Sequence, residues 1–424
     1  MKIFIYPRDR EGIEERRLKN TFDFQDEKSR LVEEIIFRVK EEGDRALFNY
    51  TREFDGAELE NLLVGQEEIE EAYRVVGQDY LSSLKKAIEN VASYHGKQLR
   101  ENWFSSERGM VGQLFIPLAR VGAYVPGGRA AYPSSVVMTV VPAKVAGVKE
   151  VVVVSPPDKE GRLNPYTLVA AKETGADEIY KVGGAQAVAA LALGTETIPR
   201  VDKIVGPGNI YVTLAKKLVY GLVDIDMLAG PSEILVLADG NANPQFIAAD
   251  LLSQAEHDPL AVCTLITTDE EVADRTLRAV EEQLKSLPKR EIANTALENN
   301  GSIIIVEYLE DGFELVNRFA PEHFELMLTD PFKYLDKIRN AGAIFIGDYS
   351  SEPLGDYMAG PNHVLPTGGT ARFASPLNTD DFIKKSSFIY YQKEELAAVK
   401  DDIIRLAELE GLDAHARAVK IRFQ

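Results

Sequence analysis

The segment Ala320-Pro321-Glu322-His323 places a carboxylate next to an imidazole directly after a proline. An imidazole whose pKa is near neutral can take a proton from an alcohol, and a nearby carboxylate can orient water or the imidazole ring. Neighbouring side chains in a regular strand point to opposite faces, so Glu322 and His323 can act together only if the chain bends after Pro321. The alternative is a pair exposed on the surface. This pair is the strongest candidate for acid–base chemistry.

Histidine is rare in this chain, with five in 424 residues, and most of the others also stand beside acids or amides. Because the few histidines stand beside acidic or amide side chains, we expect most of them to belong to one shared site. His95 is the exception, because it continues the apolar face of a predicted helix and is expected to pack at the edge of a core without a chemical role. The other three stand in the motifs Ser253-Gln254-Ala255-Glu256-His257-Asp258, Asp356-Tyr357-Met358-Ala359-Gly360-Pro361-Asn362-His363 and Glu410-Gly411-Leu412-Asp413-Ala414-His415.

Gln254 and His257 lie three residues apart near the end of a predicted helix that Pro259 terminates. This spacing puts both side chains on one helix face, where they can converge on a metal or a substrate. A histidine in a last helical turn is also stabilised by the helix dipole without any ligand, and glutamine is a poor zinc ligand. The spacing alone leaves both interpretations open.

Asp356 and His363 lie in a loop rich in glycine and proline, where functional groups are common, although an aspartate there also caps turns. Glu410 and His415 are five residues apart, which places them about 140° apart on a straight helix. Gly411 between them makes convergence possible without requiring it.

A glycine-containing turn, Val205-Gly206-Pro207-Gly208-Asn209, follows a predicted strand and opens a predicted helix. Backbone amides at such a helix start can bind a pyrophosphate. Tyr211 occupies the place of the last glycine in the G-x-G-x-x-G motif, so a dinucleotide would be held in a non-standard way.

The charge balance and the single cysteine exclude several classes of protein. With 48 basic against 67 acidic residues, the formal charge is −19, which argues against a nucleic-acid partner. Cys263 is the only cysteine, so an internal disulfide and a cysteine-ligated zinc site are excluded. The N-terminus lacks a signal-peptide core and no run approaches the roughly 18 apolar residues of a spanning helix, so we expect a cytoplasmic protein without a membrane segment.

An α/β fold has to position these residues. Helical periodicity extends over residues 22–99, then short apolar or β-branched runs alternate with helical stretches, and beyond about residue 376 the pattern is mainly helical. Strands separated by helices indicate parallel sheets covered on both faces, here as two consecutive α/β units. The predicted strands include residues 114–116, 121–125, 151–154, 178–182, 203–205, 233–237, 264–266, 303–306 and 343–346.

Eight motifs, taken together and in this order, resemble those of the histidinol dehydrogenase family from about residue 20 to the C-terminus. The motifs are Tyr124-Val125-Pro126-Gly127-Gly128, Val182-Gly183-Gly184-Ala185-Gln186-Ala187, Gly206-Pro207-Gly208-Asn209, Ala229-Gly230-Pro231-Ser232-Glu233, Ser253-Gln254-Ala255-Glu256-His257-Asp258, Ala320-Pro321-Glu322-His323, Gly360-Pro361-Asn362-His363 and Glu410-Gly411-Leu412-Asp413-Ala414-His415-Ala416-Arg417.

The resemblance implies an NAD-dependent, zinc-requiring four-electron oxidation of L-histidinol through L-histidinaldehyde to L-histidine, the final step of histidine biosynthesis. Glu322 and His323 match the catalytic positions. The implied zinc ligands are Gln254, His257, Asp356 and His415. The implied substrate contacts are Ser232, Gln254, His257, His323, Asp356, His363, Glu410 and His415. The implied cofactor contacts are Tyr124, Gln186 and Asn209.

The resemblance also implies a homodimer with shared active sites, in which Glu410 and His415 serve the neighbouring subunit. The expected fold is α/β, with two Rossmann-like, incomplete parallel-sheet units, a helical N-terminal region and a small, mainly helical C-terminal domain exchanged in the dimer. The expected parts are an arm over 1–20, a first α/β domain over 21–123 and 233–376, a second α/β domain with the cofactor contacts over 124–232, and a tail over 377–424.

In the implied mechanism zinc acts as a template for the substrate, and His323 takes the proton of the hydroxyl group. Oxidation of an aldehyde requires that a nucleophile first adds to it, and a cysteine thiolate is one such nucleophile. Cys263 lies in an apolar strand, where a thiolate is disfavoured. Water activated by Glu322, with His323 assisting, would instead form a hydrate. Two alternatives remain: a zinc hydrolase with Glu322 as its base, and a ligand-binding α/β protein without activity.

Overall fold

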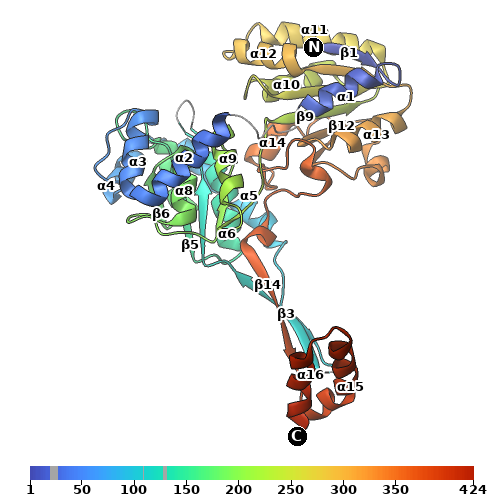
Figure 1. The fold of residues 1–424 in the computed structure, drawn as a ribbon. Helices are drawn as coiled ribbons and strands as arrows, with labels where there is room; N and C mark the ends of the chain where they lie inside the picture. The colour runs from blue at the N-terminus through green and yellow to red at the C-terminus, as the bar shows by residue number, and fades with distance from the viewer. Residues whose placement is uncertain (20–26, 108, 128–130) are drawn as a thin grey trace. The chain divides into compact units, whose positions relative to one another are not determined.

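The chain folds into two compact units (Figure 1), which are described here one at a time. The computed structural model describes residues 1–19, 27–107, 109–127 and 131–424. The first unit comprises Met1–Gln98 and Leu118–Phe382, and the second comprises Leu99–Pro117 and Ile383–Gln424. Gly128 of the first motif and the expected boundary between residues 20 and 21 lie outside the described residues. In the described ranges, no helix is long and apolar enough to cross a membrane.

The larger sheet of the first unit has six parallel strands in the order β1-β11-β10-β9-β12-β13. Helices α10, α11 and α12 cover one face, and α1 and α13 cover the other. Its strands are β1 (Lys2–Ile5), β9 (Glu233–Ala238), β10 (Val262–Thr267), β11 (Ser302–Ile305), β12 (His323–Met327) and β13 (Ala343–Ile346). The helices are α1 (Arg10–Lys19), α10 (Pro244–Ala255), α11 (Glu270–Leu284), α12 (Arg290–Asn300), α13 (Leu309–Phe319), α14 (Glu352–Tyr357) and the short η2 (Pro331–Lys337) and η3 (Thr370–Arg372). The short η4 (Thr379–Phe382) instead contacts α6 (Pro133–Val145) beside the smaller sheet.

The smaller sheet has five parallel strands in the order β6-β5-β4-β7-β8. Its strands are β4 (Arg120–Tyr124), β5 (Glu150–Ser155), β6 (Glu178–Lys181), β7 (Lys203–Val205) and β8 (Asp224–Ile225). The helices around it are α2 (Glu27–Glu42), α3 (Asp44–Tyr50), η1 (Thr51–Asp55), α4 (Gln66–Val75), α5 (Gln78–Gly96), α6 (Pro133–Val145), α7 (Pro165–Glu173), α8 (Gly184–Leu193) and α9 (Ile210–Val219).

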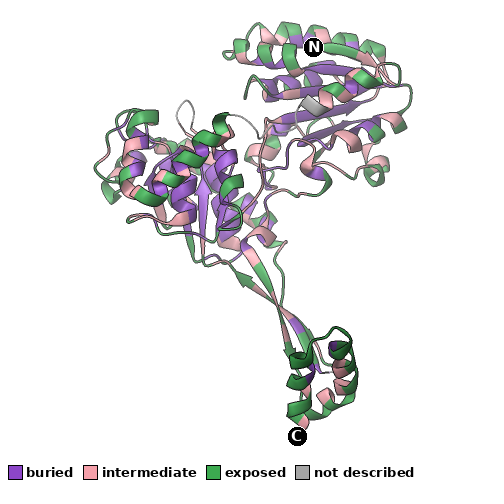
Figure 2. Cartoon of the chain, in the orientation of Figure 1, coloured by how far each residue is buried: buried purple, intermediate pink, exposed green. Residues whose placement is uncertain are grey.

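Apart from the edge strands β1, β8 and β13, the strands of both sheets are buried almost throughout (Figure 2). The four consecutive valines of β5 are fully buried, because helices cover both faces of a parallel sheet and leave no face for polar residues. Helix α10 starts where Asn243 accepts a hydrogen bond from the backbone N–H of Gln245 and Pro244 takes the first helical position. These local signals fix where α10 begins, and the helix packs against β9 and α14.

The mixed α/β architecture with parallel sheets agrees with the sequence analysis. The segment expected to form an N-terminal arm contains regular structure, because β1 pairs in parallel with β11 and α1 follows it. Ile13 on α1 is only 1% exposed and belongs to the core with Phe313. The many charged residues of α1 obscured its short apolar face.

The helices that precede the smaller sheet in the sequence pack on that sheet. Helix α2 contacts α8 and α9, α4 contacts α7, and α5 contacts α6. Leu47 of α3 shares a core cluster with Leu191 of α8. Strand β4, which also falls within residues 21–123, is a strand of the smaller sheet. The expected grouping of residues 21–123 with 233–376 therefore does not hold for these elements. An amphipathic face shows that a helix is packed, but not which sheet it covers.

The second unit is a three-stranded antiparallel sheet followed by helices. Strand β14 (Ile383–Tyr390) pairs along its whole length with β3 (Met110–Pro117), which also pairs with β2 (Trp103–Ser105). The tail, expected to be mainly helical, begins with the strand β14, which the sequence did not predict. The predicted strand at 114–116 lies in this antiparallel sheet instead of a parallel one. The helices α15 (Lys393–Leu409), α16 (Asp413–Lys420) and η5 (Ile421–Phe423) match the helical part of the expectation.

Candidate functional site

Glu322 and His323 lie at the start of β12, at the edge of the larger sheet where its strands begin. Helix α13 ends at Ala320, whose backbone is left-handed with φ 49° and which is fully buried. Pro321 follows, and both members of the pair are then buried, with 7% and 4% of their surface exposed. The bend that joint action requires is thus present. The alternative of an exposed surface pair is wrong.

The backbone of Glu233, at the start of the neighbouring strand β9, binds both members of the pair. Its N–H donates to Glu322 Oε2 at 2.9 Å, and its carbonyl oxygen lies 2.9 Å from His323 Nδ1. Because a carbonyl oxygen can only accept, Nδ1 carries the ring proton and Nε2 keeps its lone pair. Nε2 is buried and has no hydrogen-bond partner among the residues that the structure describes. It is the atom of the ring that is free to take a proton.

Burial sets the charge states of the pair. It lowers the pKa of His323, which favours the neutral imidazole, and raises the pKa of Glu322 well above that of an ordinary glutamate. The two side chains approach to 3.7 Å between Nδ1 and Oε2. A neutral imidazole and a carboxyl group with a raised pKa are suited to exchanging protons near neutral pH.

Oxygen and nitrogen donors of three side chains converge beside the pair. His257, Glu352 and Asp356 each offer a ligand atom, and these atoms lie within 4.8 Å of one another. Gln254, on the preceding turn of the chain from His257, has a buried Oε1 with no hydrogen-bond partner among the described residues. An unpartnered buried carbonyl oxygen next to an imidazole and two carboxylates fits a divalent metal ion with nitrogen and oxygen ligands.

Glu352 is the member of this group that the sequence analysis missed. It is 2% exposed, accepts a hydrogen bond from Ser253 Oγ at 2.6 Å, and donates from its backbone N–H to Glu325 Oε1 at 3.1 Å. Burial and the neighbouring Glu352 carboxylate raise the pKa of Asp356. The spacing of four residues between Glu352 and Asp356 puts both on one face of α14, and this signal was present in the sequence.

Two further predicted contact residues lie in the same unit. His363 Nδ1 is 3.6 Å from Asp356 Oδ1, and burial lowers the pKa of His363 to about 4. Ser232 directly precedes β9, and its carbonyl oxygen accepts a hydrogen bond from the backbone N–H of Val262 at 2.9 Å. His95 is fully buried and bonded to Gln98, in keeping with a structural role.

The three predicted cofactor residues lie where strands of the smaller sheet end. The Tyr124 hydroxyl, at the end of β4, accepts a hydrogen bond from the N–H of Gly184 at 3.1 Å. Gln186 is buried in the first turn of α8, and its Oε1 has no partner among the described residues. Asn209 caps α9 by accepting from the N–H groups of Tyr211 and Val212.

This arrangement fits a dinucleotide. Ligands of parallel sheets bind outside the carboxyl ends of the strands, and phosphates bind at helix N-termini such as those of α8 and α9. A Cβ atom on Gly184 would stand 2.5 Å from Gln186 Oε1, so the glycine leaves room in front of an unpartnered oxygen. The non-standard glycine motif therefore still opens a helix at the expected edge.

Glu410 and His415 belong to the second unit, where Glu410 ends α15 and His415 lies on α16. Both are exposed. The first unit thus brings together Gln254, His257, Glu322, His323, Asp356 and His363, and the two C-terminal candidates lie outside it.

Cys263 lies in the middle of the larger sheet. It is fully buried, its Sγ donates to the carbonyl oxygen of Leu251 at 3.3 Å, and burial raises the pKa of the thiol. It is therefore unsuited to act as a thiolate nucleophile.

A family model described as histidinol dehydrogenase matches residues 18–423. The chain belongs to the histidinol dehydrogenase family. It is 60% identical over 395 residues to the histidinol dehydrogenase of Carboxydothermus hydrogenoformans, covering 92% of this chain and 93% of the relative. It is 53% identical over 425 residues to that of Clostridium acetobutylicum, covering 100% and 96%.

A solved structure agrees with this assignment. The crystal structure of histidinol dehydrogenase from Elizabethkingia anophelis matches with a TM-score of 0.95 and 39% identity, covering 100% of this chain and 98% of that one. The described fold is therefore that of the family over the whole chain, and the protein is an oxidoreductase.

Proposed function

We propose that the chain catalyses the NAD-dependent, zinc-requiring oxidation of L-histidinol to L-histidine via L-histidinaldehyde, the final step of histidine biosynthesis. The observation that carries this proposal is the pair at the start of β12. His323 has its Nδ1 proton engaged with a carbonyl oxygen and its Nε2 free, directly beside the buried carboxyl group of Glu322. An oxidised alcohol has to lose its hydroxyl proton, and this ring can receive it.

Zinc would be held by Gln254, His257 and Asp356 of one subunit together with His415. The bound ion would serve as a template that fixes the imidazole and amino group of the substrate. Ser232, His363 and Glu410 would complete the contacts to the substrate, alongside Gln254, His257, His323, Asp356 and His415. Because His257 is the exposed member of the group, the site has an open side toward such additional donors.

His323 and Glu322 divide the chemistry of the two oxidations. In the first, His323 Nε2 receives the hydroxyl proton of histidinol. In the second, the carboxylate of Glu322, with His323 assisting, takes a proton from a water molecule that adds to the aldehyde, and the resulting hydrate is oxidised to the acid. Cys263 is too deeply buried and too weakly acidic to form a thioester in place of the hydrate.

Tyr124, Gln186 and Asn209 would hold NAD at the carboxyl edge of the smaller sheet, where the bound cofactor would supply the hydride acceptor for each oxidation. Gln186 Oε1 is an acceptor without a partner among the described residues. Tyr124 is held in place by the N–H of Gly184. The side-chain oxygen of Asn209 is engaged in capping α9, which leaves its amide nitrogen to face a ligand.

We further propose that the enzyme is a cytoplasmic homodimer whose subunits exchange their second units. That unit exposes large apolar side chains to an unusual extent for so small a fold. Leu409 is 78% exposed, Ile389 76% and Phe104 69%. A second copy of the chain covering this surface would also deliver His415 and Glu410 to a neighbouring site.

The proposal is tested by the appearance of NADH with L-histidinol, before and after removal of metal by a chelator and after addition of zinc. We expect NADH only with the metal-loaded protein, with activity restored by zinc. A zinc hydrolase would form no NADH, and a binding protein would bind histidinol or NAD without turnover. Metal-independent formation of NADH would contradict the role given to zinc.

A further inference from the structure

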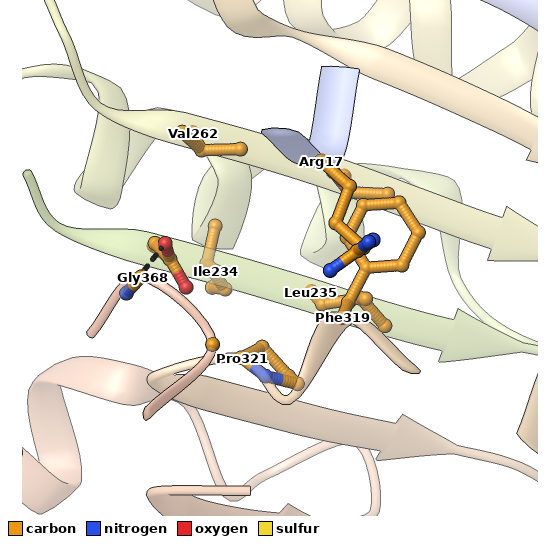
Figure 3. A pocket seen from close by; sticks show the side chains of 10 residues that line it. Arg17, Ile234, Leu235, Val262, Phe319, Pro321 and Gly368 are labelled. Carbon is orange, nitrogen blue, oxygen red and sulfur yellow. Dashed lines mark hydrogen bonds between the residues drawn. The ribbon is translucent and has the colours of Figure 1, made fainter. Parts of the chain in front are cut away.

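Glu233 makes three hydrogen bonds that join separate segments of the first unit. Its backbone N–H and carbonyl oxygen bind Glu322 and His323, as described above. Its side-chain Oε1 accepts from the backbone N–H of Gly368 at 3.0 Å, the bond drawn as a dashed line in Figure 3. One residue thus connects the reacting pair to the loop that follows His363.

We propose that Glu233 is a positioning residue, whose carboxyl bond to Gly368 fixes the peptide that orients His323 and Glu322. The inference rests on the proposed function of that pair and extends it to a residue that does not touch the substrate. The position of one side-chain oxygen would then set which nitrogen of His323 carries the proton.

The location of the carboxyl group supports this role. Glu233 is only 7% exposed and forms no ion pair among the described residues. Burying a carboxyl group without a cation is costly, so its presence needs a compensating interaction. The Gly368 amide donates a hydrogen bond to it, and a backbone hydrogen bond with Glu322 also favours its charged form. A leucine at the start of a buried strand would fill the space at lower cost, but would leave that amide without an acceptor.

A small cavity beside the carboxyl group makes its placement matter. The cavity has a volume of about 30 Å³, and its lining includes Glu233, Gly368, Pro321 and Arg17 (Figure 3). This is room for a water molecule. A shorter side chain at position 233 would therefore let water replace it at the Gly368 amide, and the peptide of residue 233 would lose its anchor.

A second link joins the same two segments without involving residue 233. The backbone N–H of Gly230 donates to Thr367 Oγ1 at 2.5 Å. The Thr367→Val variant removes this link and leaves both contacts of the Glu233 backbone in place. This variant is a matched control, because it shows the effect of weakening the connection between the two segments without changing residue 233.

The charge of Glu233 is the competing explanation. Burial raises its pKa to about 7, so the carboxyl group is positioned to change charge near neutral pH. The Glu233→Gln variant keeps an oxygen acceptor at the same reach and removes the charge. The Glu233→Asp variant keeps the charge and withdraws the oxygen by about one bond length. The two variants separate position from charge, and both keep the site polar.

The experiment measures the single-turnover rate of NADH formation and the tautomer of His323 by ¹⁵N–¹H correlation spectra of ¹⁵N-histidine-labelled enzyme, with His323→Asn identifying the signal. For Glu233→Gln we expect a rate within about threefold of wild type and an unchanged Nδ1–H tautomer. For Glu233→Asp we expect a loss of at least about tenfold with little change in KM, because misplacement of a catalytic group by about 1 Å costs this much or more, and a mixture of tautomers. Thr367→Val should keep the tautomer.

If Glu233→Asp kept the wild-type rate of NADH formation and Glu233→Gln lost it, the charge of the carboxyl group would be decisive and the proposal would be overturned. Equal losses in Glu233→Asp and Thr367→Val, with the same tautomer, would reduce Glu233 to an ordinary structural contact and also overturn it. The tautomer is read without substrate. An enzyme that forms no NADH from histidinol would therefore refute the proposed function while leaving the test of Glu233 intact.

Discussion

His323 and Glu322 share one anchor but differ in what they offer to the substrate. The ring of His323 is fixed through Nδ1, so its basic nitrogen is defined by a backbone carbonyl and not by a carboxylate. Glu322 accepts a single backbone N–H through Oε2. Its other oxygen is available to a water molecule. In the proposed function the two residues act as bases on different protons while one peptide holds both.

The Glu322→Gln variant tests this division. The amide oxygen still accepts from Glu233, so the pair keeps its geometry, but the variant cannot take a proton from water. Alcohol oxidation should stay within about tenfold of wild type, whereas oxidation of the aldehyde should fall by about 10²–10⁴. The yield of NADH per histidinol would then drop from two to one. His323→Asn is the control that should impair both oxidations, and an equal loss of both in Glu322→Gln would contradict the division.

Single residues were predictable where their chemistry is unusual in its sequence context. Glu322 and His323 stand out because an acid and an imidazole follow a proline. Glu352 did not stand out, although it faces Asp356 on the same short helix, because an isolated glutamate is most often a surface residue. Ala320 gave no signal for its left-handed backbone, with which the chain leaves α13.

The turn after β7 shows how closely two backbone segments approach each other at the carboxyl edge of the smaller sheet. Gly206 has φ 109°, and a Cβ atom there would stand 2.2 Å from the carbonyl oxygen of Tyr124. Its N–H donates to Asp226 at 2.7 Å, and its carbonyl oxygen accepts from buried Lys216 at 3.0 Å. The glycine is needed both for the backbone conformation and for the approach to β4.

Gly206→Ala should therefore lower the free energy of unfolding by about 2–4 kcal/mol, since strain and a backbone clash add, and should weaken NAD binding. Gly221→Ala is the matched control, because Gly221 has φ 101° but open space at its Cβ position. We expect only about 1–2 kcal/mol there, from strain alone. Urea unfolding and NAD titration followed by fluorescence measure both effects. If the two variants lowered the free energy of unfolding equally, the close contact between residue 206 and the Tyr124 backbone would not be the cause of the larger loss expected for Gly206→Ala.

Elements with continuous apolar runs, such as β5 and β9, were predictable because burial on both faces removes polar residues from the pattern. Edge elements were not. β1 is an edge strand of four residues, and β14 has only exposed and half-buried residues, among them two lysines. Their strand conformation comes from pairing with β11 and β3, which are distant in the sequence. The hydrophobic pattern within a short segment carries no information about which distant strand that segment pairs with.

The whole molecule brings together residues separated by long stretches of chain. His257 meets Glu352 and Asp356 because the end of the chain segment after α10 lies against α14, which contacts α10. Local patterns predicted the type of both parallel sheets but not which sheet the N-terminal helices cover. The resemblance to a family supplied the residue set. The packing of the first unit brings His257, Glu322, His323, Asp356 and His363 near one another, and Glu410 and His415 lie in the second unit.

A shared site can be tested by mixing two inactive variants, His323→Asn and His415→Asn. If His415 acts in the neighbouring subunit, each mixed dimer contains one site in which both residues are intact and one in which both are replaced. Equimolar subunit exchange makes about half of the dimers mixed, so about a quarter of wild-type activity should return. The control pairs His323→Asn with His257→Asn, whose residues both lie in the first unit, and no activity should return there. Absence of recovery in the first mixture, with mixed dimers demonstrated by mass spectrometry, would place His415 in the site of its own subunit.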